Sequence, residues 1–184
     1  MANGKPRFYW DTAPIISWIS DERRPKSEMD GLAEVIDMVE CDRAILMTSV
    51  LWRAEVLDRL NKPQIKKLEE AFQTRSLIEL GIDSRIMSLT GEIRAFHRLS
   101  KKKDGLKNIS VPDAIHLATA IHYDASEFHT FDGSRKSGAH GGLLTLNGNV
   151  AGHRIKVCTP MADQLRLDFA AGDIHDHDES DSRE

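Results

Sequence analysis

The sequence predicts an α/β fold in three layers, in which a twisted, mostly parallel sheet of four to five strands lies between helices. Two observations support this prediction. Short apolar runs alternate with segments of helical periodicity, as in successive βαβ units. The runs AILM and SLIEL are continuously apolar, as expected for strands that are buried on both faces. In such sheets functional residues gather at the carboxyl ends of the strands, beside the topological switch point.

The chain begins with an aromatic strand that leads directly into a helix. Arg7–Trp10 alternates polar and aromatic residues and is followed by Asp11. Either Asp11 or Thr12 can cap the next helix, which tolerates Pro14 in its first turn and extends to about Ile19.

Two helical segments flank a second strand. Apolar residues recur at three- and four-residue intervals in the first helix: Leu32, Val35, Ile36 and Val39. Ala44–Thr48 is a short apolar run and predicts a buried strand. Ser49 is then expected to cap a helix whose core face consists of Val50, Ala54, Leu57 and Leu60.

The middle of the chain predicts helix, strand and a long helix. Pro63 begins the first helix, whose core face consists of Ile65, Leu68 and Phe72. Leu77–Ile82 is an apolar strand. The helix over residues 83–103 has an apolar stripe of Ile86, Leu89, Ile93 and Phe96.

The last part of the predicted domain contains one helix and two strands. Val111–Pro112 opens the helix, whose core positions are Ala114, Leu117, Ala118 and Ile121. Phe128–Phe131 and Ile155–Val157 are apolar strands, and the glycine-rich segment Gly133–Gly152 between them is expected to be a loop.

Length and composition are typical of one globular domain. The chain has 184 residues, of which 40% are hydrophobic and 29% charged. It has no apolar run long enough to cross a membrane and no signal-peptide pattern, so we expect a cytoplasmic protein with reduced cysteines at positions 41 and 158. The net charge of −4 is concentrated in an acidic C-terminal tail, which leaves a mildly basic body that is compatible with a nucleic-acid partner.

Four carboxylates lie where predicted strands meet helices or loops. They are Asp11, Glu55, Asp113 and Asp132. Converging carboxylates can hold Mg²⁺ or Mn²⁺, the ions that many phosphodiester hydrolases use. Each residue also has a structural explanation.

These structural explanations remain open at this point. Asp11 is suited to cap a helix, and Asp113 lies in a helical first turn. Glu55 is four residues before Arg59 and could form an ion pair with it. Asp132–Gly133 is a turn signal.

The residues around the acids resemble the motifs of PIN-domain proteins. PDAIHLATAIHYDASEFHTFD is similar to the third and fourth motifs, in which a helix of the form D-A-x-x-x-A-x-A precedes a strand and T-x-D. YWDT resembles the first motif, and SVLWRAEV the second, with Ser49 followed by Glu55. The resemblance extends from about Phe8 to Val157. The matching positions of the third and fourth motifs are Asp113, Ala114, Ala118, Ala120, Thr130, Phe131 and Asp132.

The resemblance implies a PIN-like nuclease domain over residues 1–169, followed by an acidic, disordered tail over residues 170–184. It implies that the four acids form a pocket for Mg²⁺ or Mn²⁺, which Thr130 and Thr12 support through their hydroxyls. The implied activity is endoribonuclease cleavage of RNA, as in the VapC-like toxins of toxin–antitoxin pairs. The implied partners are an antitoxin protein and a second copy of the chain in a homodimer.

Two features depart from the family pattern, and three choices stay open. Ala13 stands where many PIN domains have Asn or Ser, and residues 133–152 suggest an insertion. His116 is expected to pack or to hydrogen-bond at the helix surface. A catalytically silent PIN-like module and a receiver-type phosphoacceptor are the alternative functions. Basic residues could contact phosphates or be solvated: Arg23, Arg24, Lys26, Lys101, Lys102, Lys103 and Lys107.

Overall fold

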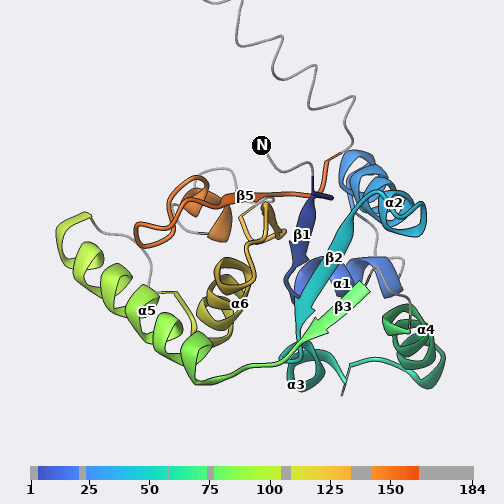
Figure 1. Ribbon diagram of the computed structural model, residues 1–184, viewed down its shortest axis with the longest axis horizontal. Coiled ribbons are helices and arrows are strands. Elements are labelled where there is room, and N and C mark those ends of the chain that lie inside the picture. The colour runs from blue at the N-terminus through green and yellow to red at the C-terminus, as the bar shows by residue number, and fades with distance from the viewer. Residues whose placement is uncertain are drawn as a thin grey trace, which may run out of the picture.

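The computed structural model confirms the predicted three-layer α/β fold (Figure 1). It describes residues 4–20, 24–57, 59–73, 77–104, 109–133 and 142–161. In these ranges five strands form one sheet in the order β3-β2-β1-β4-β5, and every pairing is parallel. The strands are β1 (Arg7–Trp10), β2 (Ile45–Ser49), β3 (Leu77–Leu80), β4 (Glu127–His129) and β5 (Lys156–Cys158).

Helices cover both faces of the sheet. In Figure 1, α5 and α6 lie on one side of β1–β3, α1, α2 and α4 lie on the other, and α3 lies at the end of the strands, where it packs into the same cluster as α1, α2 and α4. The helices are α1 (Thr12–Ser20), α2 (Lys26–Glu40), α3 (Trp52–Val56), α4 (Lys62–Phe72), α5 (Ser84–Asp104), α6 (Val111–His122) and the short 3₁₀ helix η1 (Leu143–Leu146). In the described ranges no helix combines the length and the apolar character that crossing a membrane requires.

Successive side chains of β1 point to opposite faces of the sheet and so belong to two separate core clusters. Phe8 and Trp10 point towards α1, α2 and α4, whereas Tyr9 points towards α5 and α6. All three side chains are at most 4% exposed, so β1 is buried on both faces, which its alternating polar and aromatic residues did not predict. The two apolar runs form β2 and β3: β2 is largely buried as predicted, whereas Ile78 of β3 is 38% exposed because β3 lies at the edge of the sheet.

Two predicted core faces are wrong in detail. The helix after Ser49 is only five residues long, and it buries Trp52 and Val56 while Leu57 is 37% exposed. In α5 the predicted apolar stripe fails at Phe96, which is 44% exposed. α5 buries Thr90 and His97 in addition to Ile86 and Ile93, because packing against α6 and not apolarity alone decides which helix face is covered.

The segment expected to be a loop contains some regular structure. η1 lies within it, and Val150 forms an isolated bridge with His153. Residues 134–141, and the tail after residue 161, lie outside the described residues, so the predicted domain boundary at residue 169 stays a prediction.

The strand order places a switch point between β1 and β4. The chain moves from β1 through β2 to β3 on one side, and returns with β4 and β5 on the other. A ligand site is therefore expected beside the carboxyl ends of β1 and β4. This order differs from the 2-1-3-4-5 order of receiver-type folds, and this difference removes the receiver alternative.

Candidate active site

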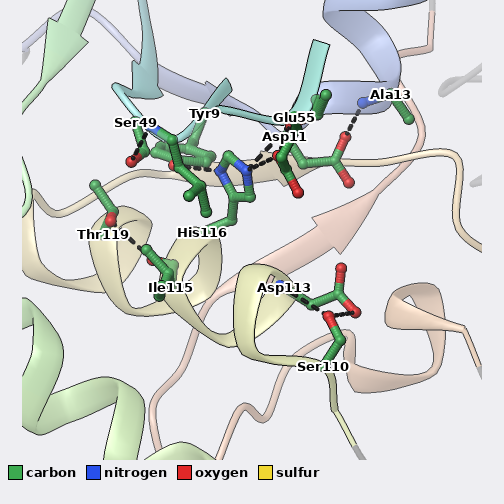
Figure 2. Close-up of polar contacts among 12 residues, drawn as sticks. Tyr9, Asp11, Ala13, Ser49, Glu55, Ser110, Asp113, Ile115, His116 and Thr119 are labelled. Atoms are coloured by element: carbon green, nitrogen blue, oxygen red, sulfur yellow. Dashed lines mark hydrogen bonds and ion pairs between the residues drawn. The ribbon is translucent and has the colours of Figure 1, made fainter. Parts of the chain in front are cut away.

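Asp11 lies at the switch point, directly after β1. Its backbone N–H donates to the carbonyl of His129 at 3.2 Å, so the end of β1 is held against the end of β4. Its Oδ1 accepts a hydrogen bond from the Ala13 N–H at 2.9 Å. Asp11 therefore begins α1 as a cap, as one structural explanation anticipates, and the same side chain also faces the site (Figure 2).

The Asp11 carboxylate is held in an environment that opposes its charge. The residue is only 8% exposed, and burial raises the pKa of this carboxyl to about 6. A hydrogen bond from the Thr130 hydroxyl and the nearby His116 lower the pKa in part, while the charge of Asp113 raises it further. A cation beside Asp11 would offset both the burial of its charge and the repulsion from Asp113.

Asp113 approaches Asp11 from the first turn of α6. Ser110 caps this helix, since its Oγ accepts from the Asp113 N–H at 3.1 Å and donates to Asp113 Oδ2 at 2.6 Å. Figure 2 shows Asp113 on α6 opposite Asp11 at the end of β1, and the charge of Asp113 contributes to the raised pKa of Asp11. Two acids from distant parts of the chain therefore lie close enough for their charges to repel each other.

Glu55 enters the site from α3 and is held by two neighbouring side chains. Its Oε2 accepts hydrogen bonds from the Thr12 hydroxyl and from His116 Nε2, the latter at 3.0 Å. Burial opposes the charge of Glu55, but these hydrogen bonds outweigh it and lower the pKa below its ordinary value. Among the described residues Arg59 forms no ion pair with Glu55, but its charge contributes to the lowered pKa of this carboxyl, so the expected partner acts only at a distance.

His116 is part of the site, which the sequence interpretation did not favour. The residue is 2% exposed and lies one helical turn after Asp113. Its Nδ1 lies 2.8 Å from the Tyr9 hydroxyl, and its Nε2 lies within hydrogen-bond distance of both Glu55 and Thr12. The i, i+3 spacing from Asp113 is the sequence signal that could have placed His116 on the same helix face.

Thr130 and Asp132 form the other border of the site. The hydroxyl of Thr130 hydrogen-bonds to the Asp11 carboxylate and accepts from the Asp132 N–H at 3.0 Å. The Asp132 carboxylate is exposed, and its Oδ2 accepts from the Leu143 N–H at 3.0 Å, where it holds the start of η1. Asp132 thus has the turn role proposed as its structural explanation, and it is tied to Asp11 through Thr130.

A second cluster with metal-ligand chemistry lies on β4 and β5. In the described ranges, Glu127, His129 and Cys158 form a group whose ligand atoms all lie within 4.8 Å of one another. None of the four predicted acids belongs to it. Parallel pairing of His129 with Cys158 brings the thiol to the group, and no spacing in the sequence indicates this contact.

Hydrogen-bond directions disfavour His129 as a metal ligand. The indole N–H of Trp10, which can only donate, lies 3.1 Å from His129 Nδ1. The Nε2 of neutral His129 therefore carries the proton and donates to Glu127 at 2.9 Å. A metal on Nε2 would require the proton to be on Nδ1 instead. The indole N–H of Trp10 would then face another donor and lose its acceptor. Lys156 also pairs with Glu127 at 3.0 Å, so the cluster is neutralised without an ion.

One predicted phosphate contact has a structural role. The Arg24 guanidinium lies 4.1 Å from the ring centre of Phe131 and pairs with Glu28 at 3.4 Å, with only 11% of its side chain exposed. The side chains of Arg23, Lys101, Lys102, Lys103 and Lys107 lie outside the described residues.

The fold and the site define an all-parallel α/β protein with an acidic site at its switch point. The sequence model of the PIN domain matches residues 8–136, which is most of the chain. The chain therefore belongs to the PIN domain family, whose members are generally nucleases. The match contains all four acids and Thr130.

A solved structure has the same fold. A chain in the crystal structure of VapBC2 from Rickettsia felis, bound to a DNA fragment from its promoter, aligns with a TM-score of 0.50 and 16% identity. The alignment covers 67% of this chain and 86% of that chain. A comparison with curated proteins found no match.

Proposed function

We propose that this protein is an endoribonuclease that depends on Mg²⁺ or Mn²⁺ and hydrolyses phosphodiester bonds of RNA. The observation that carries the proposal is the buried Asp11 carboxylate, whose pKa is raised to about 6 and which faces a second acid, Asp113. Such a pair disfavours its own ionisation when no cation is present. Within a family of nucleases, this arrangement supports a metal site for cleavage.

The residues present fit a divalent ion with oxygen ligands. Asp11, Glu55 and Asp113 offer carboxylate oxygens, the preferred ligands of Mg²⁺. Hydrogen bonds to Glu55 occupy Oε2, and Oε1 accepts no hydrogen bond from the described residues. A bound ion would supply a hydroxide nucleophile near neutral pH and offset the charge of the phosphate.

Other side chains of the protein would orient the acids and shape the rim of the site. Thr130 would hold Asp11 in place, Ser110 would fix Asp113, and Asp132 would shape the rim through η1. The exposed position of Asp132 suits it to complete the site from its solvent side. No side chain near the acids is required as a covalent nucleophile, so we propose direct attack by water.

We further propose that the protein is the toxin of a toxin–antitoxin pair, which forms a homodimer and binds an antitoxin. Two observations support this proposal. The sequence motifs resemble those of VapC-like toxins, and the similar solved structure is a VapBC2 complex. The choice of RNA as substrate rests on the same resemblance.

The test is cleavage of labelled RNA by purified protein with Mg²⁺, Mn²⁺ or EDTA. We expect cleavage only with a metal. Asp11→Asn and Asp113→Asn should lower the rate by about 100-fold or more, since even indirect partners of a metal contribute about 10–100-fold. Asp30→Asn changes an exposed carboxylate on α2 and is the matched control. Equal cleavage in EDTA, or full activity of both site variants, would contradict the proposal.

A further inference from the structure

The Glu55 carboxylate depends on contacts from outside its own helix. α3 is only five residues long, and a helix of this length has little stability of its own. About a quarter of the Glu55 side chain, 27%, is exposed. Without an external anchor the carboxylate would therefore sample several orientations. The observed contacts to Glu55 come from Thr12 and His116, which belong to α1 and α6.

His116 is the more buried of these two anchors. Its ring is 2% exposed and packs edge-on against Tyr9, with ring centres 5.9 Å apart. The Tyr9 hydroxyl lies 2.8 Å from Nδ1, and Tyr9 itself is fully buried on β1. The ring is thus held at both nitrogens, by Tyr9 at Nδ1 and by Glu55 at Nε2.

The direction of the hydrogen bond to Glu55 follows from its partners. An ionised carboxylate only accepts, so Nε2 of His116 must carry a proton and donate to Glu55 Oε2. At Nδ1 the Tyr9 hydroxyl can either donate or accept, so this contact is satisfied whichever way the ring is protonated.

The position of His116 in α6 joins two of the acids. Asp113 and His116 are one turn apart on the same helix, so α6 carries one acid directly and holds the other through the His116 ring. Any shift of α6 therefore moves Asp113 and the anchor of Glu55 together.

We propose that His116 is a positioning residue, which holds Glu55 in one orientation so that its free oxygen is presented to the divalent ion beside Asp11 and Asp113. This inference rests on the proposed metal-dependent function. In this role His116 does not contact the substrate. Second-layer partners of this kind contribute about 10–100-fold to metal affinity in other proteins.

Two substitutions separate positioning from packing. His116→Gln places an amide N–H near the position of Nε2 and can still donate to Glu55. His116→Asn is shorter and can reach Tyr9 but not Glu55. Both variants leave a polar amide in the same buried place, so a purely structural role would affect them alike.

The measurement is Mn²⁺ binding by calorimetry, with thermal unfolding in EDTA as the check on folding. We expect His116→Asn to weaken Mn²⁺ binding by about 10-fold or more, and His116→Gln to stay within about 3-fold of the wild type. Wild-type affinity in a folded His116→Asn variant would overturn the proposal. Equal weakening in both variants would also overturn it, because positioning requires the donor that Gln retains.

A spectroscopic measurement tests the same geometry without any variant or activity. Long-range ¹H–¹⁵N spectra of the metal-free wild type should show a proton on His116 Nε2, and an unprotonated Nε2 would overturn the proposal. If the wild type binds no Mn²⁺, the proposed function fails, and this spectrum alone then decides whether His116 holds Glu55.

Discussion

At the scale of single residues, the site combines a carboxylate that the fold destabilises with one that it stabilises. Burial raises the pKa of Asp11, whereas hydrogen bonds from His116 and Thr12 lower the pKa of Glu55 despite its partial burial. One acid is therefore kept ready for a cation, and the other remains ionised without one. In the proposed metal site, this difference in environment would give each acid a distinct part.

The pKa of Asp11 predicts how stability depends on pH. Its ordinary value is 3.8 and its folded value about 6, so between these pH values the unfolded chain ionises first and stability falls as pH rises. Asp11→Asn removes this loss. In EDTA we expect the variant to be more stable than the wild type by up to about 3 kcal/mol at pH 8, and equally stable at pH 4.

Urea unfolding at both pH values measures this difference. The carbonyl oxygen of Asn can still accept from the Ala13 N–H, and its amide NH₂ can donate to the Thr130 hydroxyl, so the contacts of Asp11 are largely retained. A variant that is less stable than the wild type at pH 8 would show that the Asp11 charge is compensated in the folded protein.

At the scale of elements, helix ends place the acids. Asp11 precedes α1, Asp113 lies in the first turn of α6, and Asp132 holds the start of η1. Helix N-termini attract negative charge through unpaired N–H groups. Backbone N–H groups of Ala13 and Leu143 hold Asp11 and Asp132, and the capping hydroxyl of Ser110 holds Asp113. Glu55 is the exception, because it is held by side chains of α1 and α6.

The cap of α6 should affect both stability and metal binding. Ser110→Ala removes the side-chain acceptor for Asp113 N–H and the donor to its carboxylate, and should lower the free energy of unfolding by about 1 kcal/mol. Asn61→Ala, in the capping box of α4, should have a similar effect on unfolding.

Calorimetry with Mn²⁺ shows whether either cap also affects ion binding. Only Ser110→Ala should weaken ion binding, since Asn61 has no contact with the acids in the described structure. Equal Mn²⁺ affinities in the two variants would mean that Asp113 does not depend on Ser110 for its orientation.

At the scale of the whole molecule, the sheet offers two places for an ion. The acidic site lies at the switch point between β1 and β4, and the group of Glu127, His129 and Cys158 lies on β4 and β5. In the described structure no Lys or Arg forms an ion pair with an acid of the first site, whereas Lys156 and the Trp10 indole N–H satisfy the second. We therefore expect Mg²⁺ or Mn²⁺ at the first.

Thermal unfolding with and without Mn²⁺ tests this choice. An ion that binds only the folded protein stabilises it by about 2.7 kcal/mol at 100 times its dissociation constant. The wild type and Cys158→Ser should show the same increase in melting temperature, and Asp11→Asn should show little or none. Loss of the increase in Cys158→Ser would instead place the ion on β5.

The sequence by itself determined the order of elements and the positions of Asp11 and Asp132 at strand ends. Local periodicity and helix-end signals carry this information, and family motifs add to it. Only the tertiary structure decided that His116 meets Glu55, 61 positions away, and Tyr9, 107 positions away. It also decided that Cys158 lies beside His129 and that Phe96 is exposed. Strand register and helix rotation are set by packing across the whole sheet, so no local pattern reports which distant side chains meet.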